Sequence, residues 1–166
     1  MTDQALYTIE ILIMAGDLAK RQSSDIEHER QVAIYDLTEE NYFKPLRDAP
    51  PGPYRLELSI IEQRLQFDIQ SIEGEPLGQF ILSLSPFKRG IREYHEICHS
   101  YYEAIKTAHP SKLEAIDMAR RGLHNDIAEK LMERLDDKIE MDLQTARRFI
   151  TLISTFFMSL KSTGFH

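Results

Sequence analysis

His95, Glu96 and His99 match the pattern HExxH, in which two histidines one helical turn apart bind zinc and the glutamate acts as a base. The helix predicted here has an apolar stripe that leaves His95 at its edge and His99 on its solvent side. Catalytic zinc needs a third ligand in a shielded cleft, and Glu103 would complete only an exposed stack on the same helix. We therefore keep metal-dependent hydrolysis at this motif as an alternative, and expect no resident metal and no other cofactor.

A second group of residues places charge where a helix should be apolar. On a helical wheel, Arg30 falls in the middle of a face that also carries Ile26, Ala33, Ile34 and Leu37. Three polar residues fall in the same way on the inward stripe of a later helix, at positions i, i+3 and i+7. These are Asp117, Arg120 and His124, on a stripe otherwise made of Leu113, Ile116, Leu123, Ile127, Leu131 and Leu135.

A charge removed from water needs a partner, so these four polar residues are expected to meet one another or a bound anion. In a functional interpretation, Arg30 and Arg120 hold a carboxylate or phosphate, and Asp117 orients His124 as an acid or base. In a structural interpretation, Asp117 bridges one or both arginines, and His124 only satisfies a backbone carbonyl. The sequence leaves both open.

Lys88 and Arg89 form a weaker candidate for anion binding. They lie in the first turn of a predicted helix, where backbone N–H groups are free and basic side chains oppose the helix dipole. An exposed pair there costs only tenths of a kcal/mol, so two solvated side chains are the alternative. Arg147 and Arg148, near the start of the last helix, suggest the same with less weight.

The first half of the chain is predicted to form four strands and one helix. A strand over 8–14 ends at Gly16, and Ser24 with Glu27 forms a capping box for a helix to residue 37 or 38. Residues 41–53 are rich in proline and are predicted to be a loop. Strict alternation over 54–60 and 64–69, followed by a strand over 80–84, predicts a meander with one face on the core.

From Ser85 the apolar period changes from two to 3.6, which predicts three helices. Ser85 caps the first, which ends near residue 107; Pro110 begins the second, to about residue 135; Asp142 caps the third, through Leu160. The order β-α-β-β-β-α-α-α predicts an α+β fold. It is expected to be an antiparallel sheet of about four strands with the three C-terminal helices packed on one face, as a single domain over 1–166.

The composition narrows the class of protein. A chain of 166 residues with 42% hydrophobic and 28% charged residues can bury one core, and a net charge of -7 argues against nucleic acid as a partner. The single cysteine, Cys98, forms no internal disulfide, and the longest apolar segment, over 149–160, is too short to span a membrane. These features predict a cytoplasmic protein that does not enter membranes.

Four longer strings of the sequence are distinctive: Ile26–Arg30, Ala33–Leu37, Leu82–Phe87 and Glu114–Asn125. Together they resemble one known family, the alphaproteobacterial uncharacterised protein family numbered 0262, and the resemblance covers nearly the whole chain. It implies a bacterial, cytoplasmic protein, and it carries no reaction or ligand.

The last predicted helix is apolar around more than half of its circumference, so it is either central in the core or shared with a second chain. We therefore consider a homodimer through this C-terminal helix. The leading hypothesis for function is a non-enzymatic binding or regulatory protein whose cluster of Arg30, Asp117, Arg120 and His124 holds a small anionic ligand or an acidic group of a partner protein. The alternatives are an enzyme, by hydrolysis at HExxH or acid-base chemistry at His124, and a structural or protein-interaction scaffold.

Overall fold

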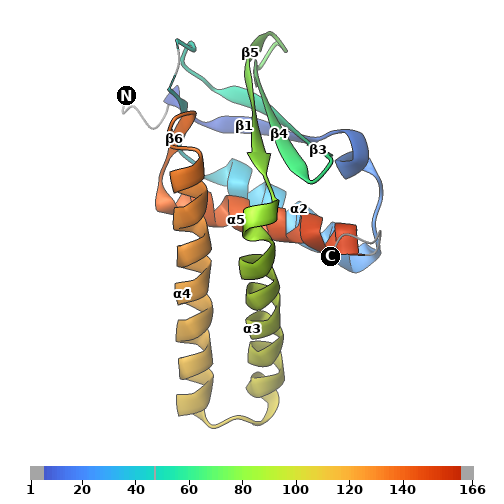
Figure 1. Cartoon of the computed structure of the whole chain (residues 1–166), viewed down its shortest axis with the longest axis vertical. Helices are drawn as coiled ribbons and strands as arrows, with labels where there is room; N and C mark the ends of the chain where they lie inside the picture. The colour runs from blue at the N-terminus through green and yellow to red at the C-terminus, as the bar shows by residue number, and fades with distance from the viewer. Residues whose placement is uncertain (1–5, 47, 162–166) are drawn as a thin grey trace.

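The computed structural model of the protein describes residues 6–46 and 48–161, and it is an α+β fold (Figure 1). A four-stranded sheet is built from β1 (Ile9–Met14), β3 (Tyr54–Ile61), β4 (Arg64–Ser71) and β5 (Pro76–Ser83), in the order β1-β3-β4-β5. The long helices are α2 (Ser24–Glu39), α3 (Lys88–Thr107), α4 (Pro110–Arg134) and α5 (Leu143–Lys161). Short 3-10 helices η1 (Gly16–Ala19) and η2 (Ser85–Phe87) follow β1 and β5.

The sheet is mixed, which corrects the antiparallel sheet expected from the sequence. β3, β4 and β5 form the predicted antiparallel meander, but β1 pairs with β3 in parallel. The chain between β1 and β3 includes α2, and a crossover of this kind returns a strand in the same direction as the first. Alternation along a strand predicts which face is buried but not the direction of its neighbour, so the sequence did not distinguish the two pairings.

The alternation in the meander has the expected effect on burial. Every second residue of β3 is fully or nearly buried, including Tyr54, Leu56 and Leu58, and Leu65 and Phe67 of β4 face the same side. The β3–β4 turn is formed by Glu62 and Gln63, both with positive φ, as the tight hairpin turns require.

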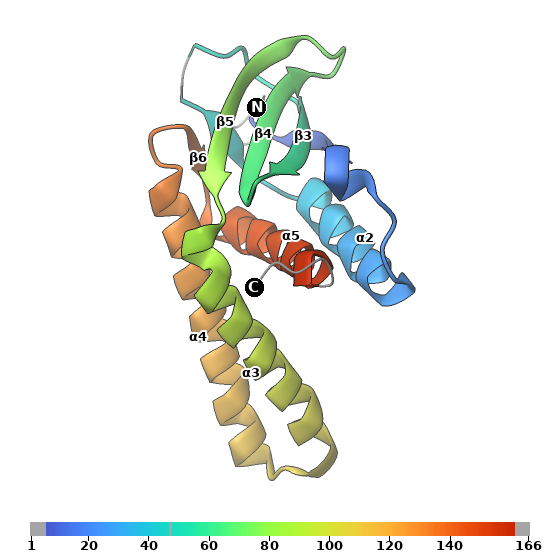
Figure 2. The same ribbon diagram turned by 45° about the vertical axis from the view of Figure 1, so that its right-hand side comes forward.

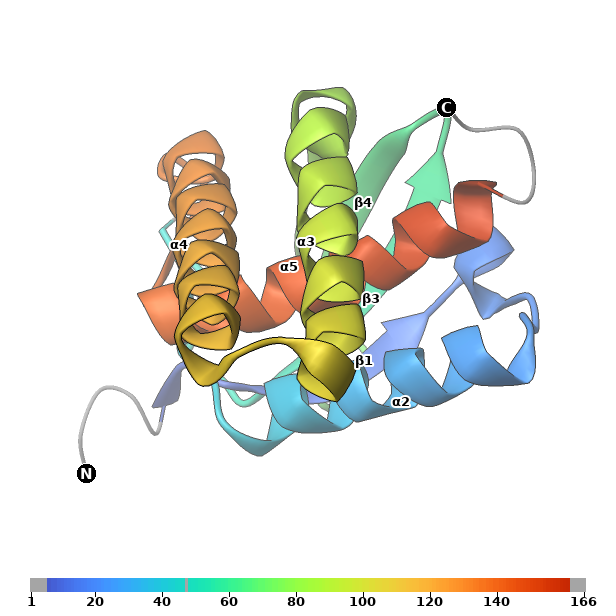
Figure 3. The same cartoon turned by 90° about the horizontal axis from the view of Figure 1, so that it is seen from below.

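Helices α2 and α5 lie side by side on one side of the sheet, and α3 and α4 stand across them (Figures 1 and 3). The cap of α2 is Ser23 rather than Ser24: its Oγ accepts from the Ile26 N–H, and Glu27 Oε1 accepts from the Gln22 N–H at 2.8 Å. Asp142 caps α5 as predicted, because its Oδ1 accepts from the Thr145 N–H at 2.9 Å.

Helices α3 and α4 form a hairpin that projects from the rest of the molecule, and we call it the arm (Figure 2). This corrects the expectation that all three C-terminal helices pack flat on the sheet, since only α5 does so together with α2. The half of the arm nearest the sheet buries Ile91, Ile127 and Leu131, whereas Tyr102 and Ile105 in the distal half are 66% and 51% exposed. An apolar stripe in the sequence thus predicts which face of a helix is apolar, but not how much of the length of that face is buried in the core.

A second, two-stranded sheet was missed by the sequence interpretation. β2 (Phe43–Pro45) lies inside the segment predicted to be a loop, and it pairs antiparallel with β6 (Ile139–Met141) between α4 and α5. Three residues are too few to show alternation, and the partners lie almost one hundred positions apart in the sequence.

The apolar face of α5 is covered within one chain. Phe149, Ile150, Leu152, Ile153 and Phe156 have no exposed surface, and the side chain of Leu160 lies outside the described residues. The helix is therefore central in the core, and its apolar face does not need a second chain. None of the helices in the described part of the chain combines the length and apolar character needed to cross a bilayer.

Alanine substitutions at two helical glycines test the packing of the arm as a matched pair. Both replace glycine by a better helix former, a gain of up to about 1 kcal/mol. A Cβ on Gly122 would meet no heavy atom within 4 Å, whereas one on Gly90 would lie 3.2 Å from Ile127 Cγ1. In urea denaturation we expect Gly122→Ala to raise the free energy of unfolding and Gly90→Ala to lie about 1–3 kcal/mol below it. Equal shifts would mean that α3 and α4 are not closely packed at Gly90.

Candidate functional site

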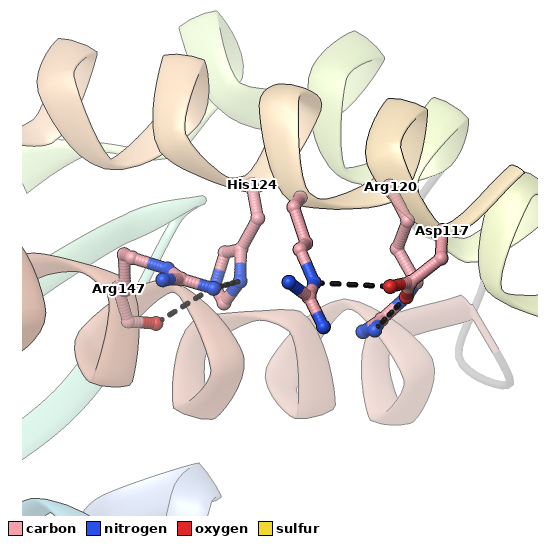
Figure 4. Close-up of polar contacts among 5 residues, drawn as sticks. Asp117, Arg120, His124 and Arg147 are labelled. Carbon is pink, nitrogen blue, oxygen red and sulfur yellow. Dashed lines mark hydrogen bonds and ion pairs between the residues drawn. The ribbon is translucent and has the colours of Figure 1, made fainter. Parts of the chain in front are cut away.

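Three of the four predicted residues, Asp117, Arg120 and His124, leave the same side of α4, and Arg147 of α5 lies next to His124 (Figure 4). Asp117 accepts hydrogen bonds from Arg120 through Oδ1 and forms an ion pair with Arg121 through Oδ2 at 3.1 Å. We call the group of Asp117, Arg120, Arg121, His124 and Arg147 the α4–α5 cluster. Four of its residues lie on α4, and the fifth, Arg147, lies on α5, whose apolar face is buried in the core.

Both ring nitrogens of His124 are occupied. Nε2 lies 3.0 Å from the carbonyl oxygen of Arg147, and Nδ1 lies 3.4 Å from an Nη of the same residue. A carbonyl can only accept and a guanidinium can only donate, so the proton belongs on Nε2 and the lone pair on Nδ1. The imidazole is therefore neutral, and Arg147 binds it from both its backbone and its side chain.

Burial also favours the neutral form of His124. His124 is only 8% exposed, and this burial lowers its pKa from the ordinary value of 6.5. The bond to the Arg147 carbonyl opposes the shift, and the charges of Arg147 and Arg120 add to it. For Asp117 the hydrogen bond from Arg120 lowers the pKa of the carboxyl group, and the same bond raises the pKa of Arg120.

Arg147 has no carboxylate partner among residues 6–46 and 48–161. Its side chain is half-buried, its Nε is buried without a hydrogen-bond partner, and one Nη reaches only the neutral ring of His124. Since a guanidinium stays charged in proteins, the α4–α5 cluster holds three arginines against one carboxylate. The cluster is thus locally positive in a chain whose net charge is -7.

Helix α3 supplies an aromatic wall beside the cluster. The ring of Tyr94 lies 5.0 Å from that of His124, and the guanidinium of Arg120 lies 5.1 Å from the centre of the Tyr101 ring. Burial raises the pKa of Tyr94 to about 12, and burial also raises the pKa of Cys98 one turn along. These two groups therefore stay protonated near neutral pH.

Arg30, the fourth predicted residue, has a different setting. It is 3% exposed, it donates to the carbonyl of Leu18 at 2.7 Å, and its guanidinium lies 5.7 Å from the centre of the Phe156 ring. Phe156 and Arg147 are nine residues apart on α5, about 13 Å along the helix axis. The contacts of Arg30 thus attach α2 to η1 and α5, away from the α4–α5 cluster.

The two basic residues at the start of α3 differ in their exposure to solvent. Arg89 is highly exposed and forms an ion pair with Glu93 one turn along at 3.2 Å, and Lys88 is half-buried. The 3-10 turn η2 runs directly into this helix start. Lys130 of α4 donates to the Pro86 carbonyl at 2.7 Å, which fixes the junction of η2 with α3.

The HExxH residues do not assemble a metal site. Glu96 and His99 are exposed on α3, and Glu103 lies 3.9 Å from Lys106 instead of beside a histidine. Within the described residues, no group of three or more histidine, cysteine, aspartate or glutamate side chains is placed to hold a metal ion. Metal-dependent hydrolysis at His95, Glu96 and His99 therefore has no supporting geometry.

Four cavities of about 560–920 Å³ lie elsewhere. The largest is a groove between α3 and α4 that includes Ile97 and Ile116, on the side of the arm away from the cluster, and another adjoins β5. The other two lie at the end of α4 and between α2 and the start of α5. None of these four is lined by the α4–α5 cluster. The cluster meets solvent through Arg120 and Arg121, whose side chains are 29% and 67% exposed.

Sequence reasoning missed the contribution of α5 to the cluster. Arg147 was noted only as a basic residue near a helix start, yet Arg147, Thr151 and Ser154 follow one another at helical spacing as a polar stripe on one side of α5. Thr151 Oγ1 lies 3.4 Å from His124 Nε2. Matching this polar stripe with the polar residues on the inward face of α4 could have predicted that His124 and Arg147 are in contact.

Comparison with known proteins supports the resemblance seen in the sequence. The profile of the uncharacterised protein family UPF0262 matches residues 6–159. A UPF0262 protein of Brucella anthropi is 56% identical over 133 residues, or 80% of this chain and 83% of the relative, and one of Mesorhizobium japonicum is 53% identical with the same coverage. No solved structure matches significantly. The chain thus belongs to the uncharacterised protein family UPF0262.

Proposed function

We propose that this protein is a non-enzymatic binding or regulatory protein, and that its α4–α5 cluster receives an acidic group of a partner protein. The observation that carries the proposal is the uncompensated guanidinium of Arg147, which is half-buried beside a neutral histidine. A buried or half-buried charge without a partner is costly, and a carboxylate that reached it would gain a charge-assisted hydrogen bond.

Acid-base catalysis is not favoured by the same geometry. A general base needs a free lone pair within reach of a substrate, and both nitrogens of His124 are already bonded to Arg147. Asp117 does not orient the histidine, because both of its oxygens contact arginines of α4. The polar groups therefore fit a role in binding better than a role in proton transfer.

An acidic side chain suits the cluster better than a small metabolite. Small ligands are usually enclosed by concave pockets, and the four cavities described above lie elsewhere. Arg121, with 67% of its side chain exposed, and Arg120, with 29%, can be approached from solvent. The net charge of -7 opposes unspecific attraction of polyanions, so binding of an acidic segment would have to arise at a local positive site.

Isothermal titration calorimetry at low ionic strength tests this proposal, with hexaglutamate, glutarate and inorganic phosphate as probes. We expect hexaglutamate to bind more tightly than the two small anions, since its six carboxylates can reach more of the three arginines than a small anion can. Arg147→Gln should weaken the binding of hexaglutamate about tenfold or more, the effect of losing one charge-assisted hydrogen bond.

The matched control is Arg89→Gln, which removes one positive charge from an exposed site on α3. It should leave the dissociation constant within about twofold, since exposed charges are screened. Equal weakening by the two variants would contradict the proposal, and so would the failure of all three probes to bind the wild-type protein.

The neutral state of His124 predicts how stability depends on pH. Because the folded pKa lies below 6.5, the folded protein binds the proton less readily than the unfolded chain does. The contribution of His124 is therefore fully present above about pH 6.5 and is lost as the pH falls through the folded pKa. We expect the free energy of unfolding to fall more steeply from pH 7.5 to 5 in the wild type than in His124→Gln.

Glutamine suits this comparison because its amide can donate to the Arg147 carbonyl and accept from the guanidinium, but it does not titrate. His99→Gln, on the exposed side of α3, should keep the wild-type slope. An unchanged slope in His124→Gln would mean that the fold does not hold His124 in its neutral form.

A further inference from the structure

Strand β5 is an outer strand of the main sheet, and its outer edge is open. It pairs with β4 on one side, and within residues 6–46 and 48–161 no strand or side chain hydrogen-bonds to its other side. The opposite edge of the sheet, at β1, is partly covered by a side chain. There the Asn41 side chain accepts from the Ile9 N–H at 2.8 Å and donates to the Ile9 carbonyl at 2.9 Å, so it covers the start of β1.

The register identifies the groups that the open edge presents. The Leu84 N–H donates to the Gln63 carbonyl, and Arg64 is paired with Ser83. In an antiparallel ladder the hydrogen-bonded residues alternate, so Leu82 and Phe80 bond to β4. The N–H and C=O groups of Gln79, Ile81 and Ser83 therefore point away from the sheet.

The second half of β5 has none of the features that usually prevent pairing at an edge strand. Natural edge strands are commonly protected by charged side chains, proline or bulges. β5 has Pro76 and a register shift at its first end, but no charged residue anywhere in its eight positions. Ile81 is 55% exposed beside the unpaired groups, so the second half of the strand is open and apolar.

A groove of about 810 Å³ adjoins this edge. Ile69, Leu77 and Phe80 line it from the sheet. On the other side it is lined by Pro45 at the end of β2, by Asp48 and Ala49, and by Lys138 before β6. Gly78 leaves the groove open, because a Cβ there would meet no heavy atom within 4 Å. Because β5 lines this groove from one side and Pro45, Ala49 and Lys138 line it from the other, a partner has to enter between two parts of the protein. This favours a single extended segment over the edge of a second sheet.

We propose that the β5 edge binds an extended segment of a partner protein, which adds to the sheet as a fifth strand. The backbone of the segment would bond to Gln79, Ile81 and Ser83, and its alternate side chains would enter the groove beside Phe80. Strand addition takes its affinity from the backbone and its specificity from the pockets for alternate side chains. The segment therefore carries apolar residues at every second position. This surface is separate from the α4–α5 cluster, and the proposal does not depend on it.

Selection from a phage-displayed library of random octapeptides on the full-length protein tests the inference. Enriched peptides should carry apolar residues at alternate positions. A synthetic copy of the most enriched one should slow hydrogen exchange at the amides of Gln79, Ile81 and Ser83. Arg147→Gln should bind this peptide as the wild type does, which separates this test from that of the α4–α5 cluster.

Two variants examine the edge and the groove independently. Ile81→Pro removes an N–H that points away from β4, so it leaves the bonds of the ladder intact. Gly78→Val fills the groove at a position with free space, and it serves if the proline variant fails to fold. Each should weaken peptide binding at least about tenfold, whereas Ile81→Val, which keeps the N–H and an apolar side chain, should stay within about twofold.

Three outcomes would overturn the inference. One is that no peptide is enriched, and another is that the enriched peptides bind Ile81→Pro and Gly78→Val as tightly as the wild type. The third is a wild-type dimer, seen by light scattering, that becomes monomeric in Ile81→Pro. In that case a second copy of this chain occupies the edge.

Discussion

The burial of α5 between the sheet and the other helices is the interaction on which the rest of the structure depends. Phe149 lies at its centre, with its ring 6.2 Å from that of Phe43 in β2 and 5.9 Å from that of Phe67 in β4. Each fully buried side chain of this size contributes about 1.5–3 kcal/mol. The buried hydroxyls of Ser154 and Thr155 donate to backbone carbonyls of α5 itself. Because the apolar face of α5 is buried in the core, Arg147 has a fixed position opposite α4.

Features encoded locally were the ones that sequence reasoning predicted well. Alternation in β3 and β4 and the cap at Asp142 each depend on a few neighbouring residues, and these predictions are confirmed. The parallel pairing of β1, the β2–β6 sheet and the projection of the arm depend on contacts between distant segments. No periodicity reports such contacts, which is why these three features could not be predicted.

In the candidate site, too, the local features were predicted and the contacts between distant segments were not. A helical wheel correctly grouped Asp117, Arg120 and His124 on one side of α4, because that grouping follows from 3.6 residues per turn. The wheel also selected Arg30, but the choice of partner is a tertiary property, and the contacts of Arg30 are with Leu18 and Phe156. Arg147 was underrated because its importance comes from the histidine opposite it and not from its own neighbours in sequence.

The shape of the arm has a consequence for motion in the native state. Near the sheet, α3 and α4 are held by buried residues such as Ile91 and Leu131, and beyond them the two helices rest mainly on each other. Few buried contacts mean a low free energy of local opening. The distal turns, around Ala108 and His109, should therefore fray and close many times during the life of one folded molecule. Amide protection in the protein will then decrease steadily from the base of the arm to its tip.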